Sequence, residues 1–289
     1  MAPICVAAPA KINLFLYVTG QRPDGYHTLF SLMCPIGLYD TLVFTPATGG
    51  IVTCDHLDVP SDDSNTAARS VRLFMETVFA ERGNTRSEFA IHIEKGIPVG
   101  AGLGGGSSDA AAVLTFLNNH YGQPLSRPAL MALGARIGAD VPFFIFGVPA
   151  LASGIGDRLE PFAGLTPQSA LLVYPNRVVS TAWVYKNLNL RLTKDEKELR
   201  KLHFNGRYFN AVEHLVNDLE PVTEKAFPVI DQIKRLLLAN GAIGAMMSGS
   251  GSTVFGLFAN HERATAARSA LCNLRQRQDW NLFVADLLI

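Results

Sequence analysis

Residues 98–112 read Pro-Val-Gly-Ala-Gly-Leu-Gly-Gly-Gly-Ser-Ser-Asp-Ala-Ala-Ala, and five of these fifteen residues are glycine. Glycine has no Cβ, so the backbone here can take positive φ angles and approach a ligand closely. An alanine-rich apolar run from Ala110 to Leu117 favours a helix, and Ser107, Ser108 and Asp109 offer N-cap chemistry at its start. Free N–H groups that open into the positive end of a helix make a site for an anion, above all phosphate. The alternative is a flexible linker, but linkers do not usually lead straight into a helix-forming run.

The loop differs from the two commonest nucleotide-binding patterns. The Walker pattern needs a lysine after its last glycine, and no lysine lies between Pro98 and Leu117, so a P-loop hydrolase is not indicated. Residues 100–105 do match Gly-x-Gly-x-x-Gly, and the strand-like run 89–93 precedes them. Glu94 to Pro98 separate the two, however, so the match gives only weak support to a dinucleotide site.

The composition is that of a globular chain with a sizeable core. Of 289 residues, 48% are hydrophobic and 17% are charged, which predicts one large domain or two smaller ones. The formal net charge is +0, so a nucleic-acid-binding surface is not expected and an anionic ligand would be held by local donors. The four cysteines are scattered, which favours reduced thiols over zinc ligands or disulfides. No membrane-spanning run or secretory leader is evident, which predicts a cytoplasmic protein without membrane partners, although a chain that had lost a transit peptide would look the same.

Strands and helices alternate irregularly along the chain. Helical spacing of apolar residues predicts helices over 66–79, 110–117, 129–137, 229–237 and 261–274. Short apolar runs predict strands over 4–19, 40–44, 51–54, 89–93, 170–174, 242–246, 253–258 and 282–285. This order favours an α+β fold over a regular parallel sheet. A turn at 154–157 suggests two domains, residues 1–155 and 156–289.

Three segments together carry a resemblance to a known family: Pro9-Ala10-Lys11-Ile12-Asn13-Leu14, the loop from Gly102 to Ser108, and Met247-Ser248-Gly249-Ser250-Gly251. Their order and spacing resemble the GHMP kinase superfamily, whose members phosphorylate small metabolites with ATP. Within it, Gly25-Tyr26-His27, the triple glycine and Gly138-Ala139-Asp140-Val141-Pro142 resemble the kinases of the non-mevalonate isoprenoid route. The acceptor implied is a cytidine diphosphate with a methylerythritol arm, phosphorylated on its 2-hydroxyl.

The resemblance implies a two-domain fold, with an N-terminal domain like ribosomal protein S5 domain 2 and a ferredoxin-like C-terminal domain. Two rival functions stay open at this point. A kinase for another small alcohol, of the homoserine or mevalonate type, would share the fold. A regulator that binds ligand without catalysis could dispense with Lys11 or Asp140, and both are present.

The resemblance also implies roles for individual residues. Asp140 matches the catalytic base for the acceptor hydroxyl, and Lys11 matches the lysine that keeps this base ionised and offsets charge on the transferred group. Without the resemblance, a helix cap or a turn is the simpler interpretation of Asp140. Ser108 would bind Mg²⁺ through its hydroxyl or cap the helix. The implied ATP site comprises Pro98, Gly100, Gly102, Leu103, Gly104, Gly105, Gly106, Ser107, Ser108, Asn65 and Lys95.

The implied acceptor site is partly aromatic. Tyr26 would stack on cytosine, His27 would read the hydrogen-bonding edge of the base, and Asn13 would hold the methylerythritol arm. Tyr185 matches a second aromatic residue over the base, often Phe in the family, or packs into the core from a helix face. The implied acceptor residues are Asn13, Tyr26, His27, Thr181 and Tyr185.

The second glycine loop, residues 248–252, has two possible tasks. It would either touch the diphosphate of the acceptor or support the first loop. The predicted cofactors are ATP and Mg²⁺, and the predicted state is a monomer or a weak homodimer.

Overall fold

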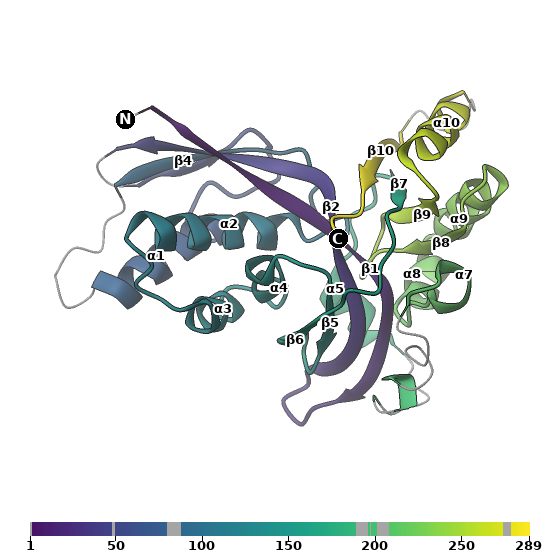
Figure 1. The fold of residues 1–289 in the computed structure, drawn as a ribbon, viewed down its shortest axis with the longest axis horizontal. Coiled ribbons are helices and arrows are strands. Elements are labelled where there is room, and N and C mark those ends of the chain that lie inside the picture. Colours follow the sequence, from purple (N-terminus) through teal and green to yellow (C-terminus); the bar gives the residue numbers. More distant parts are fainter. Residues whose placement is uncertain are drawn as a thin grey trace. The chain divides into compact units, whose positions relative to one another are not determined.

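The computed structural model describes residues 2–47, 50–79, 88–188, 196, 198–200, 208–273 and 279–289. Strands β1 (Ile4–Gln21) and β2 (His27–Pro46) pair with each other, and each contributes residues to both of two compact units (Figure 1). Unit 1 comprises Met1–Ala10, Tyr39–Val99 and Gly104–Gly147, and unit 2 comprises Lys11–Leu38, Gly100–Leu103 and Val148–Ile289. The predicted α+β class is confirmed, and the predicted chain boundary at residue 155 stays a prediction.

Unit 1 is a sheet covered on one face by helices (Figure 1). Strand β4 (Phe89–Glu94) pairs antiparallel with the last part of β2, and β3 (Val52–Cys54) pairs parallel with β4. Leu42 and Phe44 alternate along β2 and are fully buried, and they share one core with residues of the helices. These helices are α1 (Thr66–Phe79), α2 (Gly105–His120), α3 (Arg127–Ala135) and α4 (Val141–Phe146).

Unit 2 contains a second, four-stranded antiparallel sheet. Its strands follow the order β10-β7-β9-β8, and in the chain α9 directly precedes β8 while α10 lies between β9 and β10. This is the ferredoxin-like arrangement, and that prediction is confirmed. Residues of α9 and α10 share its core with Leu171, Val173 and Val254. The elements of the sheet are β7 (Ser169–Tyr174), β8 (Gly244–Met247), β9 (Val254–Phe258), β10 (Asn281–Asp286), α9 (Val229–Ala239) and α10 (His261–Cys272).

The remaining elements of unit 2 lie before and after β7 in the chain. Strand β5 (Ala150–Ser153) pairs antiparallel with the first part of β2, and β6 (Arg158–Pro161) pairs antiparallel with β5. The short helices are α5 (Thr181–Lys186), α7 (Ala211–His214) and α8 (Glu220–Ala226). Among the described residues, every helix is too short or too polar to cross a bilayer.

The start of α2 corrects one prediction. The helix begins at Gly105, before the predicted Ala110, and its N-cap is Gly104 at a φ of 77°, so Ser107, Ser108 and Asp109 lie inside the helix and do not cap it. The Ser108 and Asp109 side chains are buried, so they contribute to packing and pairing instead. Tertiary contacts here override the low helix propensity of glycine.

Candidate active site

The first half of the glycine-rich loop, Gly100–Leu103, belongs to unit 2. Both of its glycines have positive φ angles, 66° and 79°, which side chains rarely allow. The backbone N–H of Lys11 donates to the carbonyl oxygen of Leu103 at 3.0 Å, which ties this half-loop to β1. A Cβ on Gly102 would lie 2.4 Å from the carbonyl oxygen of Ser248, so only glycine fits there.

The second half of the loop, Gly104–Ser108, belongs to unit 1 and forms the first turn of α2. The half-buried Pro98 leads into the loop. The first N–H groups of a helix have no acceptor within it, and here they come from Gly105 and Gly106. These donors lie at the positive end of the helix dipole. The structure therefore supplies the backbone geometry that an anion site needs.

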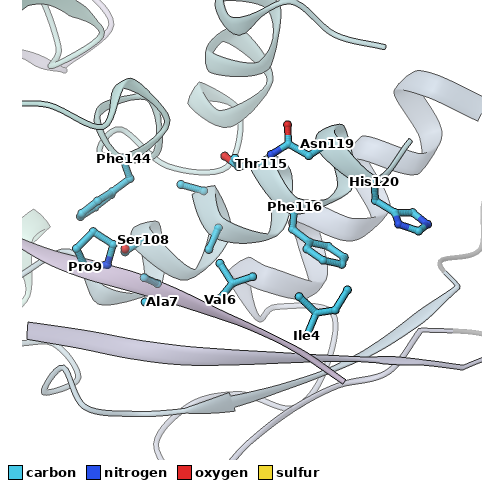
Figure 2. A pocket seen from close by; sticks show the side chains of 13 residues that line it. Ile4, Val6, Ala7, Pro9, Ser108, Thr115, Phe116, Asn119, His120 and Phe144 are labelled. Atoms are coloured by element: carbon cyan, nitrogen blue, oxygen red, sulfur yellow. The ribbon is translucent and has the colours of Figure 1, made fainter. Parts of the chain in front are cut away.

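Ser108 lies on the side of α2 that faces β1 (Figure 2). Its hydroxyl is buried and makes no hydrogen bond to any residue in the described part of the chain. It borders an apolar groove of about 500 Å³, with Pro9 of β1 and Phe144 of α4 beside it. Because Gly104 is the N-cap, the helix-cap interpretation of Ser108 is wrong.

Asp140 occupies the N-cap position of α4, but its carboxylate makes no capping hydrogen bond. The helix-cap interpretation of this residue is therefore not supported. The turn that carries Asp140 lies beside the second half of the glycine-rich loop within unit 1, because a Cβ on Gly138 would lie 3.4 Å from Ser107 Oγ.

Lys11 and Asn13 lie on β1 in unit 2, and both side chains are buried. The ammonium of Lys11 donates to Asn13 Oδ1 at 2.5 Å. Asn13 Nδ2 donates to Ser31 Oγ at 2.8 Å, and Ser31 Oγ donates to the carbonyl oxygen of Phe15 at 2.6 Å. A continuous chain of hydrogen bonds thus holds the ammonium in place.

The second glycine loop packs against the first half-loop within unit 2. Ser248 Oγ donates to the carbonyl oxygen of Gly102 at 3.0 Å. A Cβ on Gly249, whose φ is 55°, would lie 3.4 Å from Lys11 Nζ. These contacts confirm the predicted support of the first loop, and contact with the acceptor diphosphate stays a prediction.

Asn217 secures the second loop and carries no local sequence signal of this role. Its Nδ2 donates to the carbonyl oxygens of Met247 at 2.9 Å and Gly249 at 2.8 Å. These partners lie about thirty residues away in sequence, so only the folded chain reveals the role.

The predicted acceptor residues lie in unit 2. Tyr26 is 65% exposed beside the turn that precedes β2. The ring of His27 stacks on that of Tyr185, with centroids 5.0 Å apart and planes 20° apart. Tyr185 is half-buried and also packs against the core of unit 2. Thr181 Oγ1 lies 2.8 Å from Ser250 Oγ in the second glycine loop.

Asn65 and Lys95, predicted to border the adenosine of ATP, have partners within unit 1. Asn65 Oδ1 accepts from the N–H of Ala67 at 2.8 Å, and its Nδ2 donates to the carbonyl oxygen of Pro60 at 2.7 Å. The ammonium of Lys95 forms ion pairs with Asp40 and Asp109. These contacts do not show whether either residue binds ATP. The role of Asn65 and Lys95 at the adenosine therefore stays a prediction.

Comparison with known proteins identifies the family. The profile of the GHMP kinases N terminal domain matches residues 65–148, and that of the GHMP kinases C terminal matches residues 191–275. A 4-diphosphocytidyl-2-C-methyl-D-erythritol kinase of Syntrophotalea carbinolica is 49% identical over 281 residues, which cover 96% of this chain and 97% of that protein. The protein of the same name from Pelobacter propionicus is 46% identical and is covered in full, as is this chain.

The chain belongs to the 4-diphosphocytidyl-2-C-methyl-D-erythritol kinase family. A crystal structure of 4-(cytidine 5'-diphospho)-2C-methyl-D-erythritol kinase matches with a TM-score of 0.79 and 35% identity, covering 98% of this chain and 99% of that one. Homoserine kinase from Cytophaga hutchinsonii matches with a TM-score of 0.73 at 18% identity, over 100% of this chain and 95% of that one. At that identity the likeness shows the fold alone. The predicted GHMP kinase fold and this kinase family are confirmed.

Proposed function

We propose that this chain transfers the γ-phosphoryl group of ATP to the 2-hydroxyl of 4-diphosphocytidyl-2-C-methyl-D-erythritol. The observation that carries the proposal is the family membership over nearly the whole chain. The loop that opens into α2 agrees with it, because phosphoryl transfer depends mainly on positioning and on stabilising charge.

The backbone of the glycine-rich loop would hold the triphosphate. The N–H groups of Gly105 and Gly106 lie at the start of α2, where an anion is favoured by the helix dipole. The close packing of Gly102 against the second loop keeps the first half-loop in one conformation. Asn65 is proposed at the adenosine end, and Lys95 is proposed behind the loop, where its ammonium pairs with Asp40 and Asp109.

Asp140 would accept the proton of the acceptor hydroxyl as it attacks. Its carboxylate is not used as a cap, and its turn lies beside Ser107. Lys11 would stabilise the charge that develops on the transferred group. The hydrogen bonds from Lys11 through Asn13 to Ser31 fix the ammonium before substrate binds.

The acceptor would be recognised through its base and its arm. Tyr26 is exposed, so its ring can stack on cytosine. His27 would contact the polar edge of the base while its ring packs on Tyr185. Thr181 would border the diphosphate from beside the second loop, and Asn13 would hold the methylerythritol arm.

Mg²⁺ would neutralise part of the charge on the β- and γ-phosphate oxygens. The residues present fit such an ion, because Ser108 Oγ is a buried hydroxyl without a partner among the described side chains and backbone groups. Within the described ranges, no three acidic, histidine or cysteine side chains converge on one point. Ser108 would therefore supply one ligand and ATP itself the others.

The decisive experiment couples ADP release to a spectrophotometric signal with the purified chain, Mg²⁺, ATP and one acceptor at a time. Activity with the cytidine substrate and none with homoserine or mevalonate is the expected result. Equal or greater activity with either of those acceptors would overturn the proposed substrate. We also propose that the enzyme is cytoplasmic, a monomer or weak homodimer, and without membrane partners. The formal net charge of +0 supports the further proposal that it binds no nucleic acid.

A further inference from the structure

Three charged side chains form a buried cluster under the first turn of α2. Asp40 comes from β2, Lys95 follows β4, and Asp109 lies in α2. Their side chains are 0%, 5% and 4% exposed. Lys95 Nζ donates to Asp40 Oδ2 and, at 3.0 Å, to Asp109 Oδ2. All three residues belong to unit 1.

The cluster holds the segment that leads into the phosphate loop. Asp40 Oδ1 accepts hydrogen bonds from the backbone N–H groups of Gly96 and Ile97, each at 2.8 Å. One carboxylate therefore fixes the turn that comes directly before Pro98. A Cβ on Gly96 would lie 2.2 Å from the carbonyl oxygen of Tyr39, so this turn packs tightly on β2.

The same cluster holds the segment that leaves the loop. A Cβ on Gly105 would lie 3.2 Å from Asp40 Oδ2 and 3.2 Å from Lys95 Nζ, so the first residue of α2 rests on the ion pair. Asp109, one turn further along α2, reaches back to the same ammonium. Lys95 thus joins the two ends of the segment that carries the phosphate-binding N–H groups.

Stability alone does not account for this cluster. Burying charged groups is costly, and apolar side chains of similar volume are often at least as stabilising as a buried ion pair. Two carboxylates also share one ammonium here. Burial, and then the nearby Asp40, raise the pKa of Asp109 to about 7 against the opposing effect of Lys95. Asp109 Oδ1 has no hydrogen-bond partner in the described part of the chain.

We propose that Lys95 is a positioning residue, which sets the phosphate loop for ATP by holding Asp40 and Asp109 on either side of it. The inference rests on the proposed kinase function and adds a specific task to it. Lys95 acts through the backbone of Gly105 and the first turn of α2, and its ammonium stays on the two carboxylates when nucleotide binds.

The test compares Lys95→Met with Arg200→Met. Arg200 is the control, because it also pairs with two carboxylates, Glu160 and Glu196, but these three side chains are 31% to 57% exposed and none belongs to the loop. Calorimetry would measure the Kd of a non-hydrolysable ATP analogue without acceptor, and steady-state kinetics would measure KM for both substrates. Lys95→Met is expected to raise the Kd of the analogue and the KM for ATP by about 10- to 100-fold, because small misplacements of binding groups have effects of this size. The KM for the cytidine substrate is expected to stay unchanged. Arg200→Met is expected to leave all three unchanged.

Two results would overturn the proposal. One is a folded Lys95→Met protein, checked by circular dichroism, that binds the analogue as the wild type does. The other is an equal loss of ATP affinity in Arg200→Met, which would indicate general destabilisation.

If Lys95→Met does not fold, Asp109→Asn and Asp109→Ala take its place. Asparagine keeps an oxygen for the ammonium, so it is expected to retain more ATP affinity than alanine, and equal effects or none would overturn the proposal. A wild-type chain that binds the analogue but does not phosphorylate the cytidine substrate would contradict the proposed function alone.

Discussion

The ammonium of Lys11 donates a hydrogen bond to the amide oxygen of Asn13 across 2.5 Å. Both side chains are buried, and Asn13 is held in turn by the hydroxyl of Ser31. A cation fixed in this way needs no reorganisation when charge develops beside it, which is the condition for strong electrostatic stabilisation. Replacing Asn13 is therefore expected to act on Lys11 as well as on the acceptor.

Lys11→Met removes the ammonium and keeps the length of the side chain. We expect kcat to fall by about 10²- to 10³-fold, as for the loss of other preorganised donors. The KM for ATP is expected to change little, because the loop N–H groups are unaltered. Steady-state kinetics on the purified variant measures both. Near-normal turnover in a folded Lys11→Met protein would remove Lys11 from the mechanism.

Asp140→Ala separates catalysis from helix capping. A catalytic base contributes about 10²- to 10⁴-fold to kcat, so a loss of that order is expected. Loss of a helix cap is not expected to contribute to the free energy of unfolding, because the Asp140 carboxylate makes no capping bond to α4. Urea unfolding and kinetics on the same preparation test both statements.

Ser126→Ala is the matched control for Asp140→Ala. Ser126 does cap a helix, since its Oγ accepts from the N–H of Ala129 in α3 at 3.4 Å. Its loss is expected to cost about 1 kcal/mol of stability and to leave kcat unchanged. If Asp140→Ala instead behaved like this control, the helix-cap interpretation would be correct.

The glycine-rich loop shows how far a local pattern predicts a site. Its glycines indicate positive φ angles and a following helix, and the structure contains both. The start of the helix could not be predicted, because Gly105 and Gly106 have low intrinsic helix propensity. Gly105 lies against Asp40 and Lys95, and Gly106 lies against Thr66; Asp40 and Thr66 are both distant from the loop in sequence.

Asp40 carries a sequence signal for a buried charged group. Asp40, Leu42 and Phe44 occupy every second position of β2 and therefore lie on the same face of the strand. This pattern places the Asp40 carboxylate on the face that points to the core. A charged residue at such a position predicts a buried partner. Which partner it takes could not be read from the sequence, since Lys95 is 55 residues away.

Gly102→Ala tests how tightly the two glycine loops pack. The new Cβ would lie 2.4 Å from the Ser248 carbonyl oxygen and 2.9 Å from that of Gly251, at a φ of 79°. Strain and overpacking together predict a loss of about 3 kcal/mol in the free energy of unfolding. Gly122→Ala is the control, because its φ is 77° and nothing lies within 4 Å of the new Cβ. Equal losses in the two variants by urea unfolding would show that backbone strain, and not loop packing, decides the effect.

Tyr26→Ala tests recognition of the cytidine base. Loss of one stacking contact is expected to cost about 1–3 kcal/mol, which raises the KM for the cytidine substrate by roughly 5- to 150-fold. The KM for ATP and the thermal midpoint are expected to stay unchanged, because the Tyr26 side chain is 65% exposed. An unchanged KM for the cytidine substrate would contradict stacking on Tyr26. Tyr185→Phe is the companion variant and keeps the ring that packs on His27.

Cys34 is expected to be the least reactive of the four cysteines. Burial raises the pKa of its thiol from 9.0 to about 12, and its side chain is fully buried, whereas Cys5 and Cys272 are exposed. The thiolate is the reactive form, so at pH 8 the native protein should be alkylated at Cys5 and Cys272 and not at Cys34. Between pH 9.0 and 12 the folded protein keeps this proton and the unfolded chain loses it, so the thiol lowers stability as the pH rises through that window. Mass spectrometry of tryptic peptides after timed alkylation, with and without urea, would measure this order. Native-state labelling of Cys34 as fast as that of Cys5 would show that β2 opens to solvent there.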